Sequence, residues 1–220
     1  MTELRILVAD DSQSMRSAYE RILDSRDNFD IVGMASDGQE ALEMAIELVP
    51  DVVILDVRMP KLDGLAVANR LTEQVPQTAI ILVSAYDDLA FIRAIMHNGA
   101  SGRAYLLKSS LDDISEFIRV VEAVASGQAV LHRATAQDLL SMYQRQNMSP
   151  PQQLTDPEES ILRLMFNGSH EDDISKRLGL PIEELDLLIT SLCEKSGFAP
   201  QQGLSRSPQL VQAMVNACVP

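Results

Sequence analysis

The sequence predicts an α/β fold: a doubly wound parallel sheet of five strands, followed by a second, smaller domain made only of helices. In the first 130 residues, short apolar runs alternate five times with segments of helical periodicity, and after Gly127 only helical patterns remain. The apolar runs also lack the alternation of polar and apolar residues that marks a half-exposed strand. They are therefore typical of strands buried on both faces of a sheet.

Short connections join the elements of this pattern. The predicted strands are 5–9, 29–35, 51–55, 79–84 and 104–108, and the helices that follow them are 12–23, 38–48, 65–74, 87–98 and 111–126. Further helical patterns occupy 133–146, 156–166, 171–178, 182–195 and 208–217. Three prolines in 147–159 indicate a linker, so we expect a first domain at 1–130, a helix and Pro-rich linker at 131–153, and a second domain at 154–220.

Composition restricts the class of protein. The chain is 46% hydrophobic and 23% charged, as is ordinary for a globular protein, and no apolar run has the length of a membrane span. Without such a run, we expect no membrane partner. Two cysteines give no disulfide framework or metal-ligand spacing, which favours a reducing cytoplasm, and the three histidines form no local cluster. The net charge of −14 does not attract nucleic acid through the overall field, so DNA binding would need a local basic patch.

Acidic residues stand at the ends of two predicted strands. Asp10 and Asp11 follow the first strand directly, and Asp56 follows the third. In the flavodoxin-like strand order 2-1-3-4-5 these two strands are neighbours, and ligands bind at the carboxyl ends of such sheets. Ser84 ends the fourth strand and Lys108 ends the fifth. We therefore expect three carboxylates, one hydroxyl and one ammonium group at a single edge of the sheet.

This set of groups suits phosphoryl chemistry. Three close carboxylates repel one another unless a cation joins them, and Mg²⁺ with oxygen ligands is a simple solution. A lysine at the same edge supplies a charge for a phosphoryl group, and a carboxylate beside Mg²⁺ can accept phosphorus covalently. Asp56 is the candidate acceptor. The alternative is that each aspartate only caps the helix that follows its strand, as aspartate commonly does.

Residues 1–130 resemble the receiver domain of a two-component response regulator. The resemblance is carried by the pair Asp10-Asp11, the segment LDVRMPKLDG around Asp56, Ser84 after the fourth strand, and YLLK ending in Lys108. It implies the flavodoxin-like sheet, a partner histidine kinase, and phosphorylation of Asp56 with Mg²⁺ as the cofactor.

The resemblance also implies individual roles. The Mg²⁺ ligands would be Asp11, Asp56 and the backbone carbonyl of Arg58, with Asp10 acting through water, while Ser84 and Lys108 would contact phosphoryl oxygens. Tyr105 matches the family's switch aromatic, although it could instead simply fill the edge of the sheet. The segment NGASGRAYLLK (98–108) is about two residues longer than the family's usual spacing, which leaves the coupling of Tyr105 open.

Residues 154–197 resemble a LuxR-type helix-turn-helix output domain. The matching framework positions are Leu154-Thr155, Glu158, Ile161-Leu162, Leu164, Gly168, Ile174, Leu178, Leu185, Ile189, Leu192, Lys195 and Gly197. These are mainly core positions. They support a fold of four helices rather than an activity.

The helix that reads DNA in this family is acidic in this chain. Where lysine, threonine and histidine are usual, it has Glu183, Glu184, Asp186 and Leu188, and Asp172 replaces a lysine of the preceding helix. Residues 151–220 contain five Lys/Arg and ten Asp/Glu, a net charge of −5. Acids held near phosphates repel them and lose the gain from counterion release. The candidate contacts to DNA phosphates are Arg163, Lys176, Arg177 and Arg206.

Two functions therefore stay open for the second domain. It regulates transcription through DNA, as family precedent suggests, or it has lost DNA binding and acts by phosphorylation-dependent contact with a protein partner. The longer connection at 198–209 precedes the last helix, which often forms a dimer in this family, so a homodimer is a further expectation. A phosphohydrolase built on the acidic edge would require fast turnover of a soluble phosphate ester, and we do not class the protein as an enzyme.

Overall fold

The computed structural model describes residues 3–97, 99–146, 153–200 and 205–218. These residues form two compact units. Unit 1 comprises Met1–Asp87 and Gly102–Gly127, and unit 2 comprises Asp88–Ser101 and Gln128–Pro220. Residues 147–152 of the expected linker and 201–204 of the connection to the last helix lie outside the described residues, as does Asn98.

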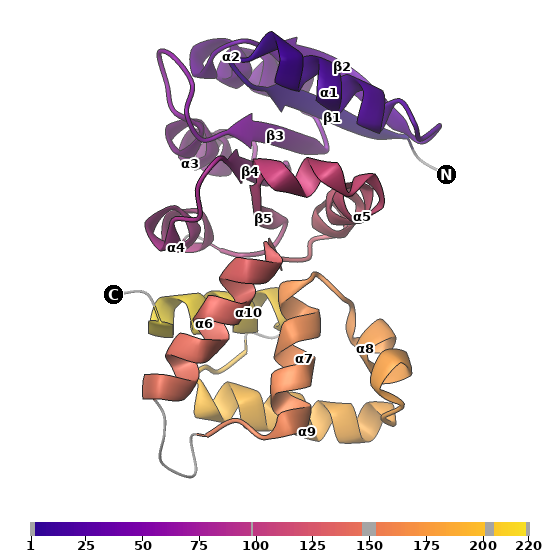
Figure 1. Ribbon diagram of the computed structural model, residues 1–220, viewed down its shortest axis with the longest axis vertical. Coiled ribbons are helices and arrows are strands. Elements are labelled where there is room, and N and C mark those ends of the chain that lie inside the picture. Colours follow the sequence, from indigo (N-terminus) through magenta and orange to yellow (C-terminus); the bar gives the residue numbers. More distant parts are fainter. Residues whose placement is uncertain (1–2, 98, 147–152, 201–204, 219–220) are drawn as a thin grey trace. The chain divides into compact units, whose positions relative to one another are not determined.

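Unit 1 is built on a parallel sheet in the order expected from the sequence (Figure 1). Its strands are β1 (Leu4–Ala9), β2 (Phe29–Ala35), β3 (Val52–Asp56), β4 (Ala79–Ser84) and β5 (Arg103–Leu107), in the order β2-β1-β3-β4-β5. Every residue of β3 and β4 is buried, in agreement with their uninterrupted apolar sequences. The register aligns the strand ends: Ala9 lies opposite Leu55, and Ser84 lies opposite Leu107.

The expected strand number of five was wrong by one. A sixth strand, β6 (Val130–Leu131), extends the order to β2-β1-β3-β4-β5-β6. It has two residues, and Val130 also forms an antiparallel bridge with Asn167. Two residues are too few to produce a periodic pattern, so this strand could not be predicted from the sequence.

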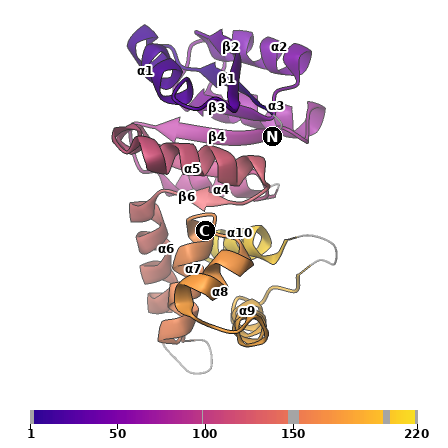
Figure 2. The same cartoon turned by 90° about the vertical axis from the view of Figure 1, so that its right-hand side faces the viewer.

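Helices cover both faces of the sheet in unit 1. They are α1 (Gln13–Leu23), α2 (Gly38–Leu48), α3 (Gly64–Gln74) and α5 (Ile114–Ala125). Figure 2 shows α1 on one side of the sheet and α2 and α3 on the other, and α5 contacts α1. A 3-10 turn over Lys108–Asp112 precedes α5, so the helix predicted at 111–126 begins only at Ile114. Asp113 caps it by accepting a hydrogen bond from the Glu116 N–H group.

Unit 2 consists almost entirely of helices. They are α4 (Leu89–His97), α6 (Arg133–Gln146), α7 (Asp156–Phe166), α8 (Glu171–Leu178), α9 (Ile182–Lys195) and α10 (Arg206–Cys218). Gly179 ends α8 with a left-handed conformation (φ +65°), which glycine adopts without strain, and the chain turns there into α9. Among the described helices, none combines the length and the apolar character needed to cross a membrane.

Candidate functional site

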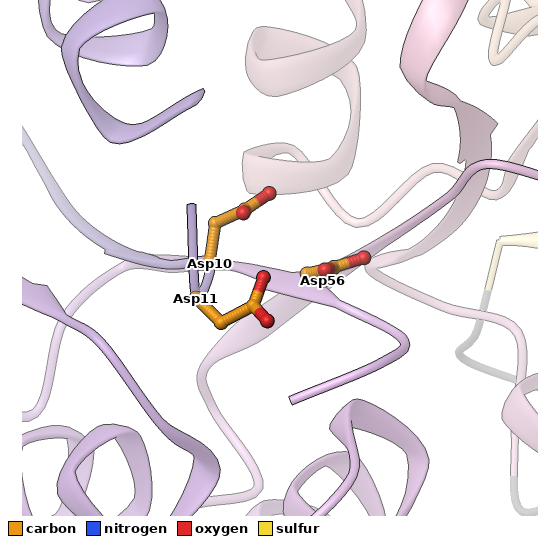
Figure 3. Close-up of side chains that lie close together, drawn as sticks. All are labelled: Asp10, Asp11 and Asp56. Atoms are coloured by element: carbon orange, nitrogen blue, oxygen red, sulfur yellow. The ribbon is translucent and has the colours of Figure 1, made fainter. Parts of the chain in front are cut away.

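Three carboxylates meet at the carboxyl ends of β1 and β3. Asp10 and Asp11 follow β1, and Asp56 is the last residue of β3. One carboxylate oxygen from each residue lies within 4.8 Å of the other two (Figure 3). Asp10 and Asp56 are 0% and 5% exposed, whereas Asp11 is exposed. The strand order alone accounts for this meeting, because β1 and β3 are hydrogen-bonded neighbours.

Lys108 lies between two of these carboxylates. It directly follows β5, and its Nζ atom lies 2.9 Å from Asp10 Oδ2 and 3.1 Å from Asp56 Oδ2. One ammonium group therefore serves two buried carboxylates. With Asp11 ionised as well, three negative charges face one positive charge.

Helix capping does not account for the three acids. Ser12 is the N-cap residue of α1 and Asp63 is that of α3, so neither helix that follows these strands is capped by Asp10, Asp11 or Asp56. Asp10 does accept a hydrogen bond from the Ser12 N–H group at 2.9 Å. That bond fixes the direction of its carboxylate and leaves the rest of its lone pairs for other partners.

Burial and like charge disfavour the ionised form of Asp56. Burial is the main cause that raises the pKa of Asp56, and the charge of Asp10 adds to it, while the hydrogen bond from Lys108 acts in the opposite direction. Burial alone would lower the pKa of Lys108, but its bonds to Asp10 and Asp56 raise it overall. The donor set is three carboxylates with an excess of negative charge. It fits a hard divalent cation such as Mg²⁺, which prefers oxygen ligands.

Ser84 and Tyr105 are both bonded to the backbone of Tyr86. Ser84 ends β4, and its Oγ atom accepts a hydrogen bond from the Tyr86 N–H group at 3.1 Å. Tyr105 in β5 is fully buried, and its hydroxyl donates to the Tyr86 carbonyl at 2.7 Å. The loop after β4 is thus held by both side chains.

Tyr86, in the loop after β4, also contacts Arg58, in the loop after β3. The guanidinium carbon of Arg58 lies 5.3 Å from the centroid of the Tyr86 ring, within the range of a cation–π contact. The stacking links the loop after β3 to the loop after β4. Sequence reasoning missed Tyr86, and the available signal was an aromatic residue two positions after Ser84, whose hydroxyl ends β4.

The sequence matches the model of a known protein family over the region that holds the acid site. A model of the response regulator receiver domain matches residues 6–122, which is more than half of the chain. The chain belongs to this family. The matched region contains every residue of the acid site, from Asp10 to Lys108.

Individual proteins extend the receiver comparison. The chain is 35% identical over 104 residues to the transcriptional regulatory protein LnrK of Bacillus subtilis (strain 168), covering 47% of this chain and 46% of LnrK. It thus spans about half the length of such curated relatives. The receiver domain of NarL from Mycobacterium tuberculosis is 34% identical, with a TM-score of 0.54 over 58% of this chain and 100% of that one. The response regulator RcsB of Salmonella typhimurium, at 19% identity, shares the fold over 100% of both chains, with a TM-score of 0.57.

Most of the four basic residues expected to contact DNA phosphates lie close to acidic side chains. Arg163 on α7 is paired with Glu159 one turn earlier. Arg206 at the start of α10 is paired with both Glu171 and Asp186. The remaining two candidates are exposed on α8, where Lys176 lies 4.0 Å from Asp173 and Arg177 is its neighbour in sequence.

The exposed face of α9 is acidic and partly apolar. Glu183, Glu184 and Asp186 are exposed there, and Leu188 is half-buried. Leu187 is 71% exposed, the largest exposure among the large hydrophobic side chains that the structure describes. Asp172 is exposed on α8. The part of α9 that resembles a DNA-reading helix in sequence thus presents negative charge to solvent, with the aliphatic side chain of Leu187 beside it.

Proposed function

We propose that the protein is a two-component response regulator in which a histidine kinase phosphorylates Asp56. One observation carries this proposal: the carboxylates of Asp10, Asp11 and Asp56 gather beside Lys108 at the carboxyl ends of β1 and β3. We assign the receiver role to residues 1–130, a connecting helix and linker to 131–153, and the output role to 154–220.

In the proposed reaction, a carboxylate oxygen of Asp56 attacks phosphorus and forms a new O–P bond. The bond from phosphorus to the donor nitrogen breaks, and the nitrogen keeps the electron pair. Lys108, already within hydrogen-bond distance of Asp56, would pair with an oxygen of the transferred group. Asp10, Asp11, Asp56 and the backbone carbonyl of Arg58 would hold Mg²⁺. The bound ion would supply positive charge between the anionic donor and the anionic acceptor.

The proposed readout passes through the loop after β4. A phosphoryl group adds negative charge and hydrogen-bond acceptors, and the Ser84 hydroxyl is the group expected to donate to it. A movement of the Ser84 side chain toward that group would take its Oγ atom away from the Tyr86 N–H group. Tyr105, which is bonded to the carbonyl of the same residue, would respond to that change.

For the output region, regulation of transcription is the first candidate. It is supported by the α8–turn–α9 arrangement and by the names of relatives such as the transcriptional regulatory protein LnrK. Arg163, Lys176, Arg177 and Arg206 are the proposed contacts to DNA phosphates, and α10 is the proposed surface of a homodimer. The cytoplasm is the proposed location, in keeping with two free buried cysteines.

The second candidate is an output region that binds a protein partner instead of DNA. The acidic face of α9 favours it, because Glu183, Glu184 and Asp186 oppose counterion release at a phosphate backbone. Fluorescence anisotropy with mixed genomic DNA at low salt, with and without acetyl phosphate, distinguishes the two. Binding with a steep salt dependence supports DNA recognition. Absence of binding in both states supports a protein partner.

Acetyl phosphate tests the receiver role directly. Incubation of the purified protein with acetyl phosphate and Mg²⁺ should add one acid-stable, base-labile phosphoryl group, measured by intact mass. Asp56→Asn should abolish the addition. Asp63→Asn is the matched control, because Asp63 caps α3 in the same region and asparagine caps equally well. Full modification of the Asp56→Asn protein would refute the assignment.

A further inference from the structure

Tyr19 places a hydroxyl group in the interior of unit 1. Its side chain on α1 is 0% exposed, and its ring centroid lies 5.8 Å from that of Phe117 on α5. A phenylalanine would fill this apolar position equally well. Among the described residues the hydroxyl has no hydrogen-bond partner, and a buried hydroxyl without one costs about 1–3 kcal/mol. Packing therefore explains the ring of Tyr19 but not its oxygen.

Helix geometry directs this side chain toward the acid site. α1 begins at Gln13, two residues after Asp11, so its N-terminal end lies at the edge of the sheet where the carboxylates meet. Side chains of a helix lean toward its N-terminus, and Tyr19 stands in the second turn. Burial is the main cause that raises the pKa of Tyr19, and the charges of Asp10 and Asp56 add to it. The Tyr19 hydroxyl thus stays protonated, and the negative charges of Asp10 and Asp56 act on it.

We propose that Tyr19 is a positioning residue for the acid site, and that its O–H group donates from the protein interior to the carboxylates of Asp10 and Asp56. This inference rests on the proposed function of the site. A carboxylate has about four lone-pair positions, and Asp10 has two known donors, the Ser12 N–H group and Lys108. The Asp10 carboxylate can therefore accept a hydrogen bond from a third donor. The structure shows no direct bond from the Tyr19 hydroxyl to either carboxylate, so a small rotation of the ring or one enclosed water molecule would complete it.

Such a donor would hold the two buried carboxylates in the orientation that a metal ion needs. Lys108 cannot do so throughout the reaction, because its ammonium is the group expected to pair with the phosphoryl oxygens. Tyr19 is fixed by its contact with Phe117 and stays in place. Loss of a group that hydrogen-bonds metal ligands from behind typically costs about 10- to 100-fold in metal affinity.

The test is Tyr19→Phe, which removes only the hydroxyl and keeps the ring that packs on Phe117. The full-length protein and the variant are titrated with MgCl₂, and the Kd is obtained by calorimetry and from the rise of the unfolding temperature with Mg²⁺. We expect a Kd at least about tenfold weaker in Tyr19→Phe, and slower modification by acetyl phosphate that saturating Mg²⁺ restores. Tyr143→Phe is the matched control. It deletes a hydroxyl in unit 2 that donates to the Lys195 carbonyl, so it should bind Mg²⁺ like the wild type.

The results of this experiment distinguish a failure of the inference from a failure of the proposed function. A Tyr19→Phe protein with wild-type Mg²⁺ affinity and a higher unfolding temperature would show that the hydroxyl is only an unpaired buried group, and would overturn the inference. If the wild type and Tyr143→Phe also show no stabilisation by Mg²⁺, the proposed function itself fails and the inference fails with it. Selective weakening in Tyr19→Phe supports both.

Discussion

Each unit of the molecule contains a buried carboxylate paired with a lysine, and the two pairs behave in opposite ways. In unit 2, Glu158 on α7 is 2% exposed and lies 2.6 Å from Lys195 Nζ. In unit 1, Asp56 is similarly buried and lies 3.1 Å from Lys108 Nζ. The pKa of Glu158 is lowered, whereas the pKa of Asp56 is raised.

The number of hydrogen-bond donors explains the difference. Glu158 accepts bonds from Lys195, from the N–H and hydroxyl groups of Thr155, and from the Ser191 hydroxyl. Burial, the largest single influence, would raise the pKa of Glu158, but these bonds together outweigh it. Asp56 shares its lysine with Asp10 and also meets the charge of that neighbour. A buried carboxylate with enough hydrogen-bond donors stabilises the fold. One with too few donors is available to bind a cation or to react with a phosphoryl group.

The largest effect expected from this comparison is on the stability of unit 2. Glu158→Ala leaves Lys195, Thr155 and Ser191 without their acceptor, and should lower the free energy of unfolding by about 3 kcal/mol. Urea unfolding measures the loss, and hydrogen exchange in α7 and α9 should locate it. Glu159→Ala is the control, since that neighbour has a part-exposed pair with Arg163 and one hydrogen bond from Gln144, together worth about 1 kcal/mol. Equal losses in the two variants would contradict the comparison.

A smaller effect of the same origin is expected at low pH. Because the pKa of Glu158 is lowered by folding, its contribution to stability is fully present above the ordinary glutamate value of about 4.3. That contribution is lost as the pH falls through the lower, folded value. Urea unfolding at a series of pH values should show this acid-dependent loss in the wild type. Glu158→Gln, which has no charge to lose, should show a shallower decline, and an identical decline would contradict the donor account.

The smallest effect has the opposite sign. In buffer free of divalent ions, Asp56→Asn should raise the free energy of unfolding by about 1 kcal/mol, because it removes a buried charge that its surroundings disfavour. Asparagine keeps an acceptor for Lys108. The measurement is thermal unfolding in the presence of a chelator, with Asp63→Asn as the neutral reference. Destabilisation by Asp56→Asn would contradict the comparison. It would mean that the hydrogen-bond donors around Asp56 stabilise its charge as fully as those around Glu158 do.

Much of the acid site could be predicted from the sequence, because the positions of strand ends are a property of the backbone. Apolar runs locate the strands, the strand order makes β1 and β3 neighbours, and the acids that follow them must then converge. The same patterns placed the helices of unit 2 within a few residues of their observed ends.

The remaining contacts depend on side-chain directions that no periodicity encodes. The sharing of Lys108 between Asp10 and Asp56, and the bond of Tyr105 to Tyr86, arise between segments far apart in the chain. Sequence reasoning did not single out Tyr19, because its ring satisfies the helical pattern whether or not its oxygen has a role. Such features become visible only when every donor and acceptor in the interior is accounted for.

The two bonds to Tyr86 have a consequence for how finely the molecule can respond. Both fix the main chain of a single residue, one through its N–H group and the other through its carbonyl, so a rotation that breaks one strains the other. We therefore expect the loop to favour two discrete arrangements over a continuous range. Under the proposed function, each copy of the protein would then report only on or off, and a graded cellular response would come from the fraction of copies in each condition.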